Sequence, residues 1–189
     1  MPHAFRRAAA LACLVAVALA HGGCQSRVVS SSDGRPLPPP PRQDLPDIPD
    51  GAAPRMMTFT VAASQRDTNG NAFPDLILAD VALFVRPEYG RSVQAPGTFV
   101  LTLYRMGEAG DPGATPLASW QIDSEDQSTW RVGLVGPGYR LRLSILDHMT
   151  DELPLIRADL VCRFEPDDPD AEVVYSDGIR SITLGRRPS

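Results

Sequence analysis

Apolar and polar residues alternate with a period of two along most of the chain after Arg55. The clearest run is 139–145, where Tyr139, Leu141, Leu143 and Ile145 alternate with Arg140, Arg142 and Ser144. Successive side chains of a β-strand point to opposite faces of the sheet. This run therefore predicts a strand with one face buried and the arginine face in water.

Seven further segments have a strand-like pattern, namely 58–63, 76–85, 98–104, 117–123, 129–134, 159–164 and 182–184. Segment 76–85 is almost continuously apolar, which is typical of a central strand. The two shorter candidates in the middle of the chain carry Trp120 and Trp130, which we expect to anchor the core. Glycine, proline and Asx clusters mark turns between the segments, at 69–70, 96–97, 111–113, 136–138 and 177–178.

The pattern predicts an all-β domain over residues 55–189, a single antiparallel β-sandwich of about eight strands. A C2-like and an immunoglobulin-like topology both fit. The cysteine pair with an intervening tryptophan that marks immunoglobulin domains is absent from the sequence, so the pattern assigns no family. A domain of this size buries roughly two-thirds of its unfolded surface and needs no disulfide for stability.

Residues 25–54 have no periodic apolar pattern and contain eight of the prolines. Proline fixes φ and removes a hydrogen-bond donor, so neither a helix nor a strand ladder is expected here. Together with Cys24, this segment is predicted to be a disordered tether, residues 24–54, that holds the domain away from its attachment point.

The N-terminus has the organisation of an export signal. Arg6 and Arg7 precede an apolar run of 13 residues, from Ala8 to Ala20. That run is shorter than the roughly 20 residues that span a bilayer. It matches the central region of a signal peptide, and residues 1–23 are the predicted signal.

The segment that follows, Leu19-Ala20-His21-Gly22-Gly23-Cys24, resembles the lipobox of bacterial lipoproteins. The resemblance implies that Cys24 becomes the acylated first residue, carrying palmitate-type chains, and that Gln25 directs the protein to the outer membrane. His21 departs from the leucine usual at its position. Cleavage after Ala20, at an A-x-A site, is the alternative and would leave Cys24 as a free thiol.

The charge and composition exclude several classes of protein. The formal net charge is −5, and removal of residues 1–23 leaves 16 basic against 23 acidic residues, a net charge of −7. A chain this acidic is not expected to bind nucleic acid, where affinity comes mainly from neutralised phosphates. All the basic residues are arginine, so chemistry that needs a lysine is excluded.

One loop has the composition of a calcium site. Residues 67–76, Asp-Thr-Asn-Gly-Asn-Ala-Phe-Pro-Asp-Leu, resemble the short calcium loop of FG-GAP repeats. The resemblance implies side-chain ligands from Asp67, Asn69, Asn71 and Asp75, with the carbonyl of Phe73 between them. Asn71 stands where the family has an acid and Ala72 where it has glycine. An Asn-Gly turn whose Asx side chains cap their own backbone is the alternative.

No residue set predicts catalysis, and we expect a non-enzymatic protein. Alternation points Cys162 into the core as a small apolar filler. His148, the only histidine of the mature chain, lies in a polar loop without a partner for nucleophilic or metal chemistry. The sequence therefore predicts a membrane-anchored envelope lipoprotein whose sandwich binds an envelope protein or polysaccharide. A calcium-stabilised module that binds carbohydrate or a surface is the alternative.

Overall fold

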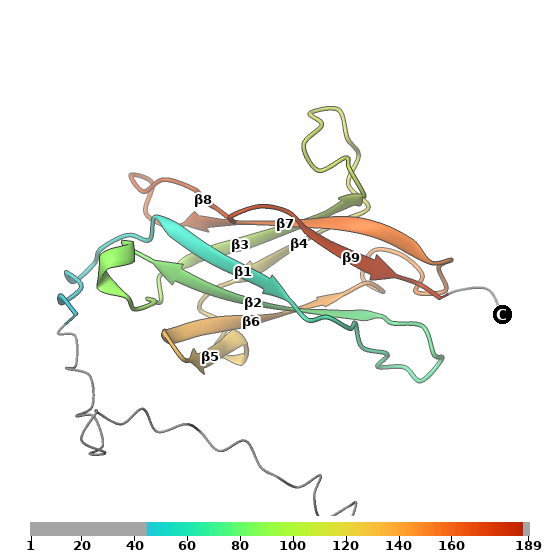
Figure 1. Cartoon of the computed structure of the whole chain (residues 1–189), viewed down its shortest axis with the longest axis horizontal. Helices are drawn as coiled ribbons and strands as arrows, with labels where there is room; N and C mark the ends of the chain where they lie inside the picture. The colour runs from blue at the N-terminus through green and yellow to red at the C-terminus, as the bar shows by residue number, and fades with distance from the viewer. Residues whose placement is uncertain (1–44, 187–189) are drawn as a thin grey trace, which may run out of the picture. The chain divides into compact units, whose positions relative to one another are not determined.

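A computed structural model describes residues 45–186, and within them the protein is built from nine β-strands and two short 3₁₀ helices (Figure 1). All nine strands and the entire buried core lie in one unit of the chain, Asp44–Ser189. Because its sheets and core are complete within this unit, we expect residues 44–189 to fold on their own.

The first sheet has four antiparallel strands. Their order across the sheet is β1 (Met56–Val61), β2 (Leu76–Phe84), β6 (Gly136–Ser144) and β5 (Trp130–Gly133). Strands β5 and β6 form a hairpin that ends at the pair Gly133 and Gly136. The short helix η2 (Gln127–Thr129) leads directly into β5.

The second sheet has five antiparallel strands. Its path is β4 (Ala118–Asp123), β3 (Gly97–Arg105), β7 (Ile156–Pro166) and β8 (Val174–Tyr175), while β9 (Arg180–Leu184) pairs with the other half of β7. The helix η1 (Pro87–Tyr89) lies in the connection between β2 and β3.

The prediction of an all-β sandwich is confirmed. The structure has nine strands where the sequence predicted about eight. The additional strand, β8, contains only Val174 and Tyr175. Two residues are too few to show a period, so no sequence pattern could have revealed this strand.

Aromatic side chains from both sheets meet in the core. Phe99 of β3 packs edge-on against Tyr139 of β6, with ring centroids 4.7 Å apart, and lies 4.9 Å from Phe164 of β7. Burial raises the pKa of Tyr139, and hydrogen bonding between its hydroxyl and the backbone of Ala95 partly offsets that rise. The inward faces predicted from alternation on these strands are confirmed.

The two tryptophans differ in their surroundings. Trp120 is only 6 % exposed, and its indole Nε1 donates a 2.9 Å hydrogen bond to the carbonyl of Ser144, which links β4 to β6. The prediction for Trp130 is wrong, because this side chain is 39 % exposed. All four residues of β5 are exposed, so the strand lacks a covering layer that would bury an anchor.

An arginine joins the last strand to the first. Nε of Arg180, on β9, donates a 2.7 Å hydrogen bond to the carbonyl of Phe59 on β1, and its guanidinium lies 5.9 Å from the centre of the Phe59 ring. The same guanidinium pairs with Asp177 at 2.8 Å. The two sheets are thereby connected along one side of the sandwich.

Of the predicted tether, only residues 45–54 lie within the described part of the chain. Arg91 donates to the carbonyl of Pro46 at 3.1 Å and to the carboxylate of Asp47 at 3.4 Å. Pro54 is buried where this segment enters β1. The predicted signal peptide, Cys24 and the rest of the tether lie outside the described residues. In residues 45–186, no helix has the length and apolar character needed to cross a membrane.

Candidate functional site

The outer face of the first sheet carries a groove, which we call the sheet groove. It has a volume of about 450 Å³ and lies between β1, the β2–β6 pair and the β5–β6 hairpin. Its lining residues are Thr58, Thr60, Asp80, Val81, Ala82, Arg131, Val132, Gly133, Val135, Gly136, Pro137, Gly138, Tyr139 and Arg140. The groove runs over a sheet surface rather than into the core.

Small residues make the groove possible. Gly138 lies on the face turned toward the groove, where a Cβ would come 2.9 Å from the carbonyl oxygen of Val81. Gly136 has φ +121°, and a Cβ there would meet Oγ of Ser92 at 2.9 Å. Larger residues at these positions would displace the hairpin or fill the floor of the groove. The glycines therefore set its shape.

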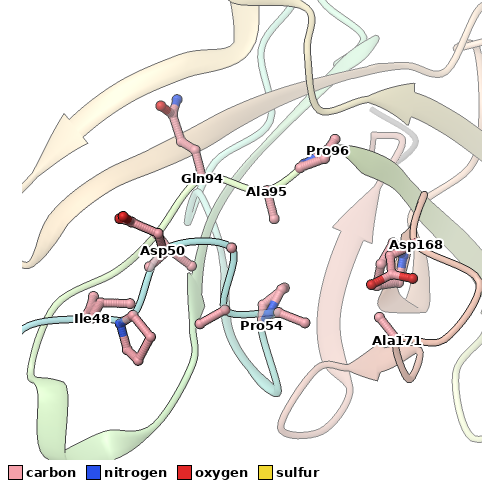
Figure 2. Close-up of a pocket in the computed structure, with 14 residues that line it drawn as sticks. Ile48, Asp50, Pro54, Gln94, Ala95, Pro96, Asp168 and Ala171 are labelled. Atoms are coloured by element: carbon pink, nitrogen blue, oxygen red, sulfur yellow. The ribbon is translucent and has the colours of Figure 1, made fainter.

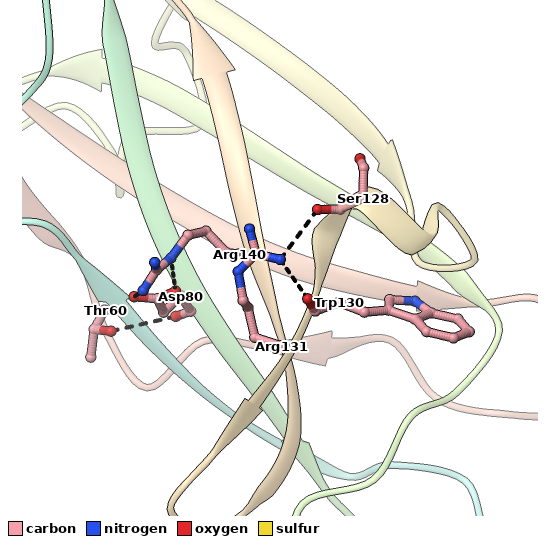
Figure 3. Close-up of polar contacts among 6 residues, drawn as sticks. All are labelled: Thr60, Asp80, Ser128, Trp130, Arg131 and Arg140. Carbon is pink, nitrogen blue, oxygen red and sulfur yellow. Dashed lines mark hydrogen bonds and ion pairs between the residues drawn. The ribbon is translucent and has the colours of Figure 1, made fainter.

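The centre of the groove is an arginine–carboxylate pair. Arg140 of β6 and Asp80 of β2 are register partners, and Arg140 donates through Nε at 2.7 Å and through Nη2 at 3.1 Å (Figure 3). This forked geometry fixes the guanidinium in one orientation. The hydrogen bond to Asp80, and then the charge of Asp80, raise the pKa of Arg140 above its already high value. Thr60 donates to the carbonyl of Asp80 from the neighbouring strand at 3.5 Å.

The second guanidinium of the groove has no carboxylate partner. Nη1 of Arg131 donates to the carbonyl of Trp130 at 2.6 Å and to that of Ser128 at 3.5 Å (Figure 3). Among residues 45–186, no ion pair includes Arg131. Because a guanidinium has five N–H donors, this side chain retains donors and an unneutralised charge for a ligand.

Chemically, the sheet groove is suited to binding. Its polar side chains are two threonines, two arginines and one aspartate, and the aspartate is already held by Arg140. The threonines and arginines can donate hydrogen bonds to a ligand, and the arginines carry positive charge. Together they form a donor-rich strip that would fit an extended ligand bearing oxygen acceptors.

The predicted calcium loop folds as a series of Asx turns. The carboxylate of Asp67 accepts from the backbone N–H groups of Gly70 and Ala72, each at 2.7 Å. The side-chain oxygens of Asn69 and Asn71 each accept the N–H two residues further on, at 3.0 and 2.8 Å. These hydrogen bonds form the Asx turns of the alternative proposed from the sequence.

Asp75 faces a different neighbour from the other predicted ligands. Its carboxylate is buried and accepts two hydrogen bonds from Thr68, from the backbone N–H at 2.9 Å and from the hydroxyl at 2.7 Å. Phe73, whose carbonyl was the remaining predicted ligand, donates its own N–H to Asn71. Within the described residues, no group of three or more His, Cys, Asp or Glu side chains is arranged to hold a metal.

A carboxylate that sequence reasoning missed completes this loop. Asp151, from the connection between β6 and β7, is 5 % exposed and accepts from the amide Nδ2 of Asn69 at 2.7 Å and of Asn71 at 2.9 Å. The hydrogen bond from Asn69 is the main cause that lowers the pKa of Asp151, and the bond from Asn71 adds to it. Asp151 is 80 or more residues away from both asparagines in the sequence, so no local sequence pattern could have predicted this contact.

A second hollow, of about 390 Å³, is lined by the segment before β1, the segment before β3 and the loop after β7 (Figure 2). Its walls are mainly proline and alanine from 48–54, 93–96 and 166–171. Asp168, one of its two acids, already accepts the N–H of Asp170 at 3.0 Å in an Asx turn. The hollow offers no convergent set of polar groups, and we assign it no role.

The two remaining candidates are not reactive groups. Cys162 is a free, buried cysteine, as alternation predicted, and burial raises the pKa of its thiol to about 12. His148 is exposed and rests with its ring edge-on to Trp120, at a centroid distance of 5.1 Å. Neither side chain lies in the sheet groove.

A comparison of the chain with models of known protein families found no match, and a search of curated proteins likewise found no similar sequence. The sheet groove and the 67–75 loop are therefore interpreted from their own chemistry.

Proposed function

We propose that this protein is a non-enzymatic binding module of the bacterial cell envelope, attached to a membrane through acylated Cys24. In this proposal the sheet groove receives an extended envelope macromolecule, a polysaccharide or a segment of a protein. The attachment rests on the lipobox-like sequence, and the groove is the part of the folded domain that supports recognition.

The observation that carries the proposal is the preorganised donor strip of the groove. Arg140 is locked by Asp80, and Arg131 is held by two backbone carbonyls while it keeps an unpaired charge. Fixed donors bind a ligand without first losing side-chain freedom, which raises affinity. Both arginine side chains are exposed, so neither packs in the core and both can be reached by a ligand.

The groove can be tested by photo-crosslinking in cells. A photoreactive residue placed at Thr58, inside the groove, should capture a partner, whereas the same residue at Thr183 should not. Thr183 is a matched control because it is also an exposed threonine in a strand, on β9 of the other sheet. Digestion of the captured material with protease or glycosidase identifies its class.

A second comparison tests the charge. Arg131→Ala should reduce capture from position 58, and Arg157→Ala, which removes an exposed arginine from β7, should leave it unchanged. Equal capture at positions 58 and 183, or capture that survives Arg131→Ala, would count against the groove as the recognition surface.

The anchor has its own test, which is the intact mass of the protein extracted from membranes. Acylation at Cys24 gives the mass of residues 24–189 plus the lipid chains. A mass that includes Met1, or one that begins at His21, would refute the lipid anchor and leave the groove proposal standing.

A calcium-stabilised module remains a second candidate, and Asp151 is the observation that favours it. This carboxylate comes from a distant loop and faces the amides of Asn69 and Asn71, so rotation of those amides would turn additional oxygens toward it. Melting of residues 44–189 with calcium and with chelator tests the candidate. A midpoint that calcium does not raise, or raises equally in Asp67→Ala, removes it.

A further inference from the structure

The tip of the β5–β6 hairpin is the most exposed apolar feature of the described chain. Val132 is 92 % exposed and Leu134 is 108 % exposed, and no other large apolar side chain between residues 45 and 186 exceeds 69 %. Val135, next to Leu134 in the turn, is 46 % exposed. We call these three side chains the hairpin tip. Figure 1 shows the hairpin at the edge of the first sheet.

Folding does not explain these residues. The turn joins Gly133 to Gly136 through only two residues, Leu134 and Val135. Two-residue hairpin turns favour glycine, asparagine or aspartate because they usually need positive φ. Neither Leu134 nor Val135 has positive φ, and neither side chain is buried. Polar residues would satisfy the turn equally well, so an apolar pair here points to an external contact.

The hairpin is held firmly at its base. Ser92, itself buried, donates its hydroxyl to the carbonyl of Pro137 at 2.5 Å and its backbone N–H to the carbonyl of Val135 at 2.9 Å. Gly136 lies against the same serine. The tip is therefore presented in one orientation and does not fold back onto the domain.

The charge around the tip differs from that of the whole chain, which is −5. No acid occurs between Asp126 and Asp147, a stretch that contains Arg131, Arg140 and Arg142. Asp126 precedes β5 and so lies at the end of this strand away from the tip. Arg131 is the one charged residue of β5, and no ion pair between residues 45 and 186 includes it.

We propose that the hairpin tip inserts into the surface of a phospholipid bilayer that contains anionic headgroups. Val132, Leu134 and Val135 enter the boundary between headgroups and acyl chains, and Arg131 approaches the phosphates. Trp130 lies at the opposite end of β5, where its Nε1 donates a 2.8 Å hydrogen bond to the carbonyl of Ser124, and it is not part of the inserted tip.

A bilayer fits the tip better than a protein partner does. Stable protein interfaces use about 20–30 residues on each side, whereas the tip offers three apolar side chains at the end of a narrow hairpin. A lipid surface requires no matching shape. The inference goes beyond the proposed function, since it adds a direct membrane contact by the folded domain and does not depend on acylation of Cys24. Arg131, Val132 and Val135 also line the sheet groove, so the two proposals share these three side chains, and binding to vesicles tests the membrane contact separately from capture in cells.

The test measures binding of residues 44–189, without any lipid anchor, to two sets of vesicles. One set contains phosphatidylglycerol and phosphatidylethanolamine, and the other contains only phosphatidylcholine. Co-sedimentation with the vesicles measures the bound fraction of the protein. We expect co-sedimentation with the anionic vesicles.

Three variants make the test specific. Val132→Ser with Leu134→Ser should lower partitioning by at least about tenfold, because two apolar side chains no longer leave water. Arg131→Gln should lower it by about fivefold on anionic vesicles and leave phosphatidylcholine binding unchanged. Tyr175→Ser, which removes a side chain 69 % exposed on β8, is the matched control and should have no effect.

Each outcome supports or overturns the proposal. All substituted positions are exposed, so unchanged melting midpoints will show that the variants fold. Failure of the wild-type fragment to bind either vesicle overturns the proposal, as does equal binding by the double-serine variant. If the double-serine variant instead loses a protein captured in cells while the wild-type fragment ignores vesicles, the tip is a protein contact and the bilayer is excluded.

Discussion

Ala72 provides a quantitative test of the conformation of the 67–75 loop. Its φ is +69°, the only positive value for a residue other than glycine in the described chain. The backbone is held there partly by the 2.7 Å hydrogen bond from its N–H to Asp67. Left-handed backbone costs a residue with a Cβ about 1–2 kcal/mol, and glycine avoids that cost.

The substitution Ala72→Gly should therefore stabilise the domain. Glycine also adds entropy to the unfolded chain, which offsets about 0.4–1 kcal/mol of the relief. The net gain in the free energy of unfolding is about 0.5–1 kcal/mol. For a domain of this size that corresponds to a rise of roughly 1–4 °C in the melting midpoint, and to about 0.3–0.5 M in the urea midpoint.

The neighbouring Gly70 supplies the matched control. Its φ is +80°, and a Cβ at that position would have no heavy atom within 4 Å. Gly70→Ala should therefore destabilise the domain by about the amount that Ala72→Gly stabilises it, through backbone strain alone. Urea unfolding of residues 44–189 measures both. If Ala72→Gly lowered the midpoint while Gly70→Ala behaved as expected, residue 72 would not have left-handed backbone in the native loop.

Three further predictions concern a thiol, the core and a carboxylate. Cys162 is the only thiol of residues 44–189, and burial raises its pKa to about 12. At pH 8 it should therefore react with maleimide roughly a thousandfold more slowly in the folded domain than in urea. Similar rates in both states would show that the thiol is accessible in the folded domain. Phe99→Ala should lower the free energy of unfolding, measured in urea, by about 3–5 kcal/mol, because the ring lies fully buried between the two sheets. A loss below about 1 kcal/mol would mean that the sheets do not pack around this ring. Asp151→Ala should lower stability at pH 7. Hydrogen bonds from Asn69 and Asn71 lower the pKa of this carboxyl, so its contribution is present above its unfolded pKa of about 4 and is lost as the pH falls through the folded value. The urea midpoints of variant and wild type should converge at acid pH, and a constant difference from pH 7 to pH 2 would contradict this origin.

The strands could be predicted because their signal is local. Leu141 and Leu143 alternate with arginines, and the same period placed Cys162 on an inner face, where the structure has it. The prediction that Trp130 is buried was wrong because the burial of a strand depends on what covers it. The sequence of β5 resembles that of a covered strand, but β5 lies at the edge of its sheet and all its residues are exposed.

The candidate sites could be predicted only in part, for the same reason. The Asx turns of Asp67, Asn69 and Asn71 follow from residue types within a few positions of one another. The contact of that loop with Asp151 depends on how β6 and β7 are connected. The sheet groove likewise exists only once β2 and β6 are paired, which brings Asp80 opposite Arg140 across 60 residues of sequence.

The contacts of residues 45–54 determine how the domain would respond to mechanical load. A pull applied from the N-terminal side reaches Pro46 and Asp47 before it reaches β1, so the exposed bonds from Arg91 would break first. Exposed ion pairs contribute little to stability, and these contacts would yield at low force. The force would then meet the six paired residues of β1 and the bond from Arg180 to Phe59. Residues 45–54 would thus detach and extend before the force reaches the strands of the sandwich.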